Sequence, residues 1–142
     1  MPEQSKQKLQ EKYVLYQLLN QNLESLKQQQ DMIQQQFIEL KSTVMSISDM
    51  GSLKESNEVL VPLGGGCFGK GKVTDSKNVI VSIGSGLFMS KKSESAKSYI
   101  EDRLNEMEMA NKEIQGHMER IARQMNDMGA EIQELSRQQK KP

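Results

Sequence analysis

The sequence predicts an α+β chain in which a long antiparallel coiled-coil hairpin holds a short β segment at its middle. Two heptad series of apolar residues, neither interrupted by proline, predict the two helices. Between them, short apolar runs separated by glycine-rich turns predict strands. We expect one domain, made of a coiled-coil helix over residues 1–48, a β segment over 52–92 and a second coiled-coil helix over 93–142.

The first heptad series advances from Leu9 in alternating steps of three and four residues, and ten of its twelve positions are apolar. The residues between them are largely Gln, Lys and Glu, which favour helices. A stripe this narrow is typical of a coiled-coil seam rather than of a globular helix face. The twelve positions are Leu9, Lys12, Tyr16, Leu19, Leu23, Leu26, Gln30, Ile33, Phe37, Leu40, Val44 and Ile47.

The second series begins at Ile100, and again ten of twelve positions are apolar. Ser93 or Ser95 is a suitable cap for this helix. Two interpretations of the polar seam residues Gln30 and Asn111 stay open: they fix the helix register at a cost in stability, or they are simply tolerated. The positions are Ile100, Leu104, Met107, Asn111, Ile114, Met118, Ile121, Met125, Met128, Ile132, Leu135 and Gln139.

The two series are nearly equal in length, and each predicts a helix roughly 60 Å long at about 1.5 Å per residue. Equal lengths on one chain favour helices that fold back on each other as an antiparallel hairpin. In that arrangement residues 13–19 lie across from about 128–135, at the end away from the β segment.

The β segment contains four expected strands, which pair as two hairpins. They cover Glu58–Leu63, Cys67–Val73, Asn78–Gly84 and Leu87–Lys91, with turn residues between them. Two isolated hairpins are marginally stable and leave strand edges unpaired, so we expect this segment to assemble with other subunits. The expected assembly residues are Val59, Val61, Leu63, Phe68, Val79, Val81, Ile83 and Leu87.

Composition argues against several functions. Nineteen basic residues balance nineteen acidic ones, which removes the simplest case for nucleic-acid binding, and we expect no nucleic-acid partner. We expect no membrane partner, because no apolar run approaches 18 residues and no signal-like leader opens the chain. A single cysteine, Cys67, excludes an internal disulfide, and the cytoplasm is the expected location.

No chemical motif is complete, so we expect neither an enzyme nor a cofactor or metal. Residues 64–71 begin like a phosphate-binding loop, but Gly71 stands where a Ser or Thr is required and no helix is expected to follow. A structural glycine turn is therefore favoured over nucleotide binding. Cys67 and His117 have no partners at metal-ligand or catalytic spacing.

The free end of the hairpin has more apolar side chains than its seam can bury. Residues 13–19 are apolar on nearly every side of the helix, and the facing seam is rich in methionine, which suits adaptable protein binding. Packing against another helix is the alternative explanation. The expected client-binding residues are Leu9, Tyr13, Val14, Leu15, Leu18, Met128, Ile132 and Leu135.

The middle of the chain resembles the alpha class of prefoldin subunits. The resemblance rests on Val61-Pro62-Leu63-Gly64-Gly65-Gly66, on Val79-Ile80-Val81-Ser82-Ile83-Gly84-Ser85-Gly86 and on the helix start Ala96-Lys97-Ser98-Tyr99-Ile100. It extends over essentially the whole chain, and the archaeal form is the expected type.

The resemblance implies a hexamer of two alpha and four beta subunits whose hairpins join in a β-barrel. It also implies a chaperone that needs no ATP, captures unfolded proteins at its coiled-coil tips and transfers them to a group II chaperonin. The alternative is a structural scaffold or adaptor whose coiled coil binds one dedicated protein partner.

Overall fold

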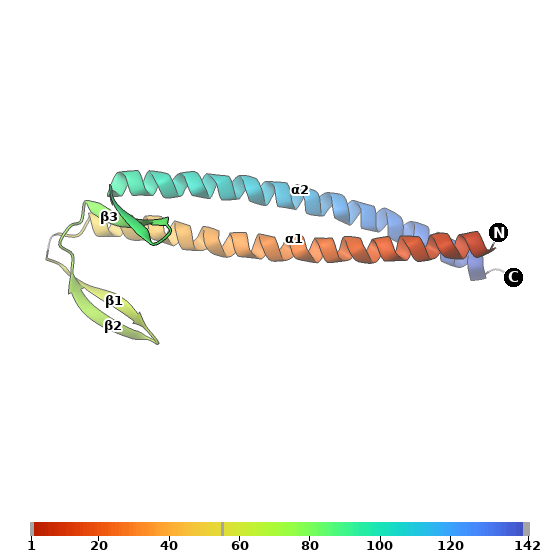
Figure 1. Cartoon of the computed structure of the whole chain (residues 1–142), viewed down its shortest axis with the longest axis horizontal. Helices are drawn as coiled ribbons and strands as arrows, with labels where there is room; N and C mark the ends of the chain where they lie inside the picture. The colour runs from red at the N-terminus through yellow and green to blue at the C-terminus, as the bar shows by residue number, and fades with distance from the viewer. Residues whose placement is uncertain (1, 55, 141–142) are drawn as a thin grey trace. The chain divides into compact units, whose positions relative to one another are not determined.

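The computed structural model describes residues 2–54 and 56–140; Met1, Lys141 and Pro142, which fall in the expected helices, lie outside this range. Along the chain, a long helix is followed by four short strands and then by a second long helix (Figure 1). The elements are α1 (Pro2–Gly51), β1 (Glu58–Gly64), β2 (Cys67–Lys72), β3 (Asn78–Gly84), β4 (Leu87–Lys92) and α2 (Ser93–Lys140). The predicted fold class is confirmed: two long helices and two antiparallel hairpins.

The chain divides into two compact units, each of which contains part of both helices. The first unit joins the start of α1, up to Gln35, with the end of α2, from Glu108. The second unit runs from Gln36 to Met107 and contains both hairpins.

In the first unit, the two helix segments run antiparallel and pack along the predicted seam. Lys12 forms an ion pair with Glu131, and the ring of Tyr16 lies over Gly129, where an added Cβ would be 3.9 Å away. The predicted α1 seam positions here are half-buried, while most of their neighbours are exposed. Ile121 is the most buried residue of this unit, at 4% exposure. The prediction for Gln139 is wrong: its side chain is exposed, because the polar end of α2 extends past the last packed seam residue.

In the second unit, a small apolar core joins both helices to one hairpin. Ile47, Ala96 and Ile100 form its buried cluster. The half-buried residues packed against this cluster are Leu40, Val44, Val79, Val81 and Leu104. Because Val79 and Val81 belong to β3, this core attaches the β3–β4 hairpin to the helices.

Helix α1 ends at Gly51, three residues later than predicted. Its last carbonyls are satisfied by tighter turns, with Ser52 N–H 3.2 Å from Asp49 O and Leu53 N–H 3.1 Å from Met50 O. The hydroxyl of Ser52 also donates to Asp49 O at 2.7 Å. Ser52 therefore closes the helix with both its backbone amide and its hydroxyl.

Both hairpins close through two-residue turns in which every residue has positive φ. The angles are 59° and 79° at Gly65 and Gly66, and 53° and 74° at Ser85 and Gly86. Such turns match the right-handed twist of paired strands and favour Gly, Asn or Asp. The pairing register shifts just before each turn, at Gly64 and Gly84. The two sheets remain separate, with β1 paired to β2 and β3 to β4.

A carboxylate organises the linker between the hairpins. Asp75 Oδ1 accepts from the backbone N–H of Lys77 at 2.9 Å and of Asn78 at 3.2 Å, and Oδ2 accepts from the side-chain amide of Asn78 at 2.9 Å. These hydrogen bonds, that of the Asn78 side chain above all, lower the pKa of Asp75 from its ordinary value of 3.8. The start of α2 is tied to the same linker, since Ser93 N–H donates to Lys77 O at 2.8 Å.

Candidate functional site

The first unit exposes an apolar patch on α1 that consists of Tyr13, Val14, Leu15 and Leu18. Each is between 49% and 55% exposed. None is a seam position, and α1 places Val14 and Leu18 one turn apart, with Leu15 beside both. On the facing part of α2, the exposed residues from Asn126 to Gln138 are polar except for Ala130. Near the patch, the exposed large apolar side chains therefore all belong to α1.

A groove of about 500 Å³ lies on one side of this patch. It is formed by Leu9, Gln10, Tyr13 and Val14 of α1 with Ile132 and Ser136 of α2. The structure thus brings together four of the eight predicted client-binding residues. The remaining predicted residues of α2, Met128 and Leu135, are half-buried in the seam and do not line it.

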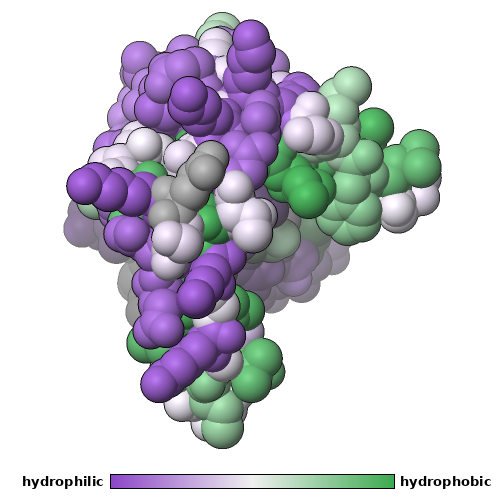
Figure 2. All heavy atoms as spheres, turned by 90° about the vertical axis from the view of Figure 1, so that its left-hand side faces the viewer, coloured by the Kyte–Doolittle hydropathy of each residue, from purple (hydrophilic) through white to green (hydrophobic). Residues whose placement is uncertain are grey.

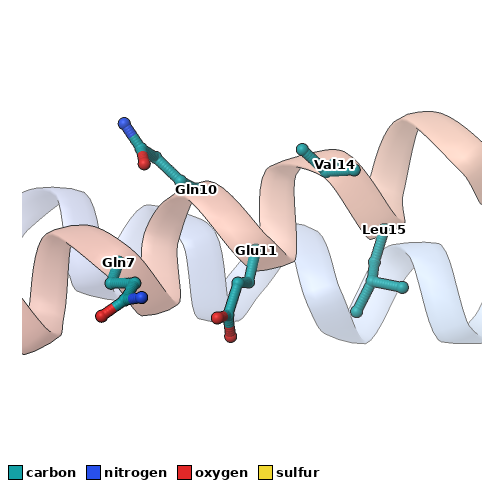
Figure 3. Close-up of a pocket in the computed structure, with 5 residues that line it drawn as sticks. All are labelled: Gln7, Gln10, Glu11, Val14 and Leu15. Carbon is teal, nitrogen blue, oxygen red and sulfur yellow. The ribbon is translucent and has the colours of Figure 1, made fainter.

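A second groove of about 540 Å³ lies along α1 on the other side of Val14. Its five lining residues are Gln7, Gln10, Glu11, Val14 and Leu15 (Figure 3). Figure 3 shows Gln10 and Val14 pointing to one side of α1, and Gln7, Glu11 and Leu15 to the other. Gln10 and Val14 are therefore the two side chains that both grooves share.

Sequence reasoning missed the polar members of these grooves. Gln10 and Glu11 lie three or four residues before predicted apolar residues, and Gln7 lies one turn before Glu11, so helical spacing places them on the same faces. Helical spacing from the apolar residues is the sequence signal that identifies these polar positions. Ser136 likewise lies one turn after Ile132.

The hairpins form the other exposed apolar surface. Of the predicted assembly residues, Val61, Leu63, Phe68, Ile83 and Leu87 are exposed, whereas Val59, Val79 and Val81 are half-buried. Figure 2 shows this surface as two green areas, β1–β2 at the bottom of the view and β3–β4 at the right. Val79 and Val81 contact the chain's own helical core, so they are less available to another subunit than predicted.

The sequence prediction overlooked four further exposed apolar side chains of the strands. Ile80 is 76% exposed, and Leu60, Phe88 and Met89 are also exposed. Alternation along a strand could have found Ile80, since a residue between Val79 and Val81 must point to the other face. In β1–β2, Val59, Val61 and Leu63 lean over Gly69 and Gly71, where an added Cβ would lie 3.4 Å from Val61 and 3.8 Å from Leu63.

The glycine-rich segment is a turn and a strand. Gly65 and Gly66 form the β1–β2 turn, and Cys67–Lys72 continues as a strand where a phosphate-binding loop would start a helix. Within residues 2–54 and 56–140, no three His, Cys, Asp or Glu side chains are grouped to hold a metal ion. No helix of the described chain is long and apolar enough to cross a membrane.

Comparisons with known proteins agree with this architecture. The prefoldin subunit family model matches residues 19–138. A curated relative, prefoldin subunit alpha of Methanoculleus marisnigri, is 28% identical over 115 residues, which are 80% of this chain and 75% of the relative. The structure of filamentous prefoldin from Methanocaldococcus jannaschii superposes with a TM-score of 0.71 at 22% identity, covering 86% of this chain and 98% of that one.

The family match begins at Leu19, directly after the exposed patch of Tyr13, Val14, Leu15 and Leu18. The patch therefore lies outside the residues that the family model matches. Both helices and both hairpins lie within the match for most of their length. The chain belongs to the prefoldin family of chaperone subunits, and its alpha-class resemblance is confirmed.

Proposed function

We propose that this chain is a subunit of a chaperone that holds unfolded proteins without ATP and passes them to a group II chaperonin. It works in the cytoplasm and uses no cofactor. Its helical arm contacts the client through the patch of Tyr13, Val14, Leu15 and Leu18, with Leu9 and Ile132 in the adjoining groove. Met128 and Leu135 support this surface from the seam.

The observation that supports this proposal most directly is the half exposure of the four patch residues on α1. Isolated exposed apolar side chains are ordinary, but four within six residues leave a continuous apolar surface in water. A surface of this size gives weak binding by itself. Several such arms on one complex would retain a client through multivalency, because each further contact is made at high effective concentration.

The hairpins are the proposed joint with the beta-class subunits. Each two-stranded sheet has exposed apolar residues and unpaired edges, both of which a larger barrel would cover. We propose the hexamer of two alpha and four beta subunits that the family resemblance implies. A lone chain that remained a stable monomer with its hairpins folded would contradict this joint.

A matched pair of variants tests the client site. In the first, the four patch residues are changed to Ser. In the second, four exposed apolar residues elsewhere on the helices are changed to Ser: Met32, Ile38, Met45 and Met109. Aggregation of a chemically denatured model protein is followed by light scattering, with the complex at near-stoichiometric amounts.

We expect the patch variant to lose most of its protection and the control variant to keep it. Both should assemble like the parent, as measured by mass, because neither set lies in the hairpins. Full protection by an assembled patch variant would show that the client site is elsewhere. Complexes that never suppress aggregation, the parent included, would favour the alternative of a scaffold with one dedicated partner.

A further inference from the structure

Two adjacent levels of the α1–α2 seam each contain a polar residue. Lys12 lies beside Glu131 and Tyr16 beside Gly129, which sets the antiparallel register of the first unit. Continued along the helices, this register places Gln30 level with Ile114, and Ile33 level with Asn111. The polar residues are thus on opposite helices, one turn apart. We call these two levels the polar break.

Asn111 makes the polar break unfavourable in the closed arm. Its side-chain oxygen is shielded from solvent, and it has no hydrogen-bond partner among the described residues. A buried acceptor without a partner loses the hydrogen bonds that it makes with water when exposed. Lys12, the other polar seam residue of this unit, differs because its ammonium reaches Glu131 and remains partly exposed.

The first unit has fewer buried apolar residues than the second, so its two helices should separate more easily. Of the described apolar residues, the second unit contains four that are buried: Ile47, Val73, Ala96 and Ile100. The first unit contains one, Ile121, and its other seam residues are half-buried. Proteins open locally where few apolar contacts are buried, so separation of α1 from α2 should start in the first unit. Gln30 and Asn111 both lie near the inner limit of that unit, which ends at Gln35 and resumes at Glu108.

We propose that the polar break is the point to which the arm opens from its free end. Separating the helices up to Gln30 and Asn111 hydrates the Asn111 oxygen, which recovers part of the cost of exposing the apolar levels. Opening further gains nothing comparable, because the next seam residues are apolar. The open state exposes seam side chains from Leu9 to Gln30 and from Asn111 to Leu135. Resting on the proposed function, we infer that these side chains extend the client-binding surface.

Hydrogen exchange of the full chain in its native assembly, measured by mass spectrometry, tests the opening point. The Asn111→Leu variant removes the unpaired oxygen and adds an apolar contact. An unpaired buried group corresponds to between about 5- and 150-fold in an opening equilibrium. We therefore expect backbone amides of residues 9–26 and 118–135 to exchange at least about fivefold more slowly, with residues 40–47 and 96–104 unchanged.

Three further variants make the result specific. Gln30→Leu should slow exchange over the same residues, which guards against an Asn111→Leu variant that fails to fold. Gln29→Leu and Asn105→Leu make the same kinds of change at exposed positions and should leave exchange as in the parent. Equal slowing in both regions would show general stabilisation and overturn the proposal, as would no slowing in either seam variant.

Client retention separates this proposal from the proposed function. The parent and the Asn111→Leu variant are compared for how long they hold a denatured model protein. Shorter retention by the variant, together with slower exchange, would support an open arm that contacts clients. Slower exchange with unchanged retention would refute the client part of the inference, and it would leave the patch of Tyr13, Val14, Leu15 and Leu18 as the site. The exchange measurement itself involves no client, so it stands even if the chain holds none.

Discussion

Removing a seam isoleucine should destabilise the arm far more than removing an exposed one. Ile121 is 4% exposed and lies level with Leu23 in the antiparallel register, whereas Ile38 is 59% exposed on α1. The changes Ile121→Ala and Ile38→Ala delete the same atoms from a helix. They therefore differ in burial and not in chemistry.

The expected magnitude follows from this burial. Truncation of a fully enclosed isoleucine to alanine costs about 2–5 kcal/mol. The seam neighbours of Ile121 are only half-buried, so the cavity can partly collapse or fill with water, and we expect about 2–3 kcal/mol. Ile38→Ala should change the free energy of unfolding by less than about 0.5 kcal/mol, since alanine is the better helix former.

Urea denaturation followed by far-ultraviolet circular dichroism measures both variants. The protein concentration must be the same throughout, because association of subunits contributes to the apparent stability. Equal losses in the two variants would show that the outer face of α1 is buried in solution, and the burial argument would then be wrong. A loss below about 0.5 kcal/mol for Ile121→Ala would show that the seam is not packed at this level.

Three further predictions concern the second unit. Ser85 has a φ of 53° in the β3–β4 turn, so Ser85→Asn should raise the free energy of unfolding by about 0.5 kcal/mol and Ser85→Val should lower it, as measured in urea. Tyr99 lies under the Lys91 ammonium at 4.4 Å and near the Arg103 guanidinium at 6.0 Å; Tyr99→Leu should lower stability by about 0.5–1 kcal/mol in thermal denaturation, and Tyr99→Phe should keep most of it. The lowered pKa of Asp75 means that its folded loop favours the carboxylate, so this stabilisation is complete above pH 3.8 and is lost as the pH falls towards the folded pKa. An NMR titration should place the Asp75 midpoint below 3.8, and a midpoint at or above that value would contradict the hydrogen-bonded loop.

The helical seam could be predicted from sequence because its cause is local and periodic. A heptad spacing places apolar residues on one stripe of any helix, and the stripe must be covered. Because the two stripes are nearly equal in length, each was the expected partner of the other. Of the α2 seam, only Gln139 was placed wrongly, at an end where periodicity continues but packing does not. The strands and turns were predicted for the same reason, since positive φ at the turns requires glycine or a residue that tolerates it.

The client patch was predicted from a count of apolar residues in excess of the seam, and the structure exposes all four of its members. The grooves around it were not predicted, because each combines residues from different turns or from both helices. Gln10 and Ser136 are ordinary polar residues in the sequence. They line one groove together only because side chains separated by more than a hundred positions lie side by side.

By itself, the sequence determined the helices, the two hairpins, the seam and the apolar excess near Tyr13, because each follows from spacing along one element. Only the tertiary structure decided which face of the β3–β4 hairpin remains open. Val79 and Ile80 are neighbours of equal apolar character, but Val79 packs against the core of Ile47, Ala96 and Ile100, while Ile80 is 76% exposed. The alternation of a strand says that the two residues face opposite ways. It cannot say which way the helices lie, because that depends on contacts between elements that are distant in the chain.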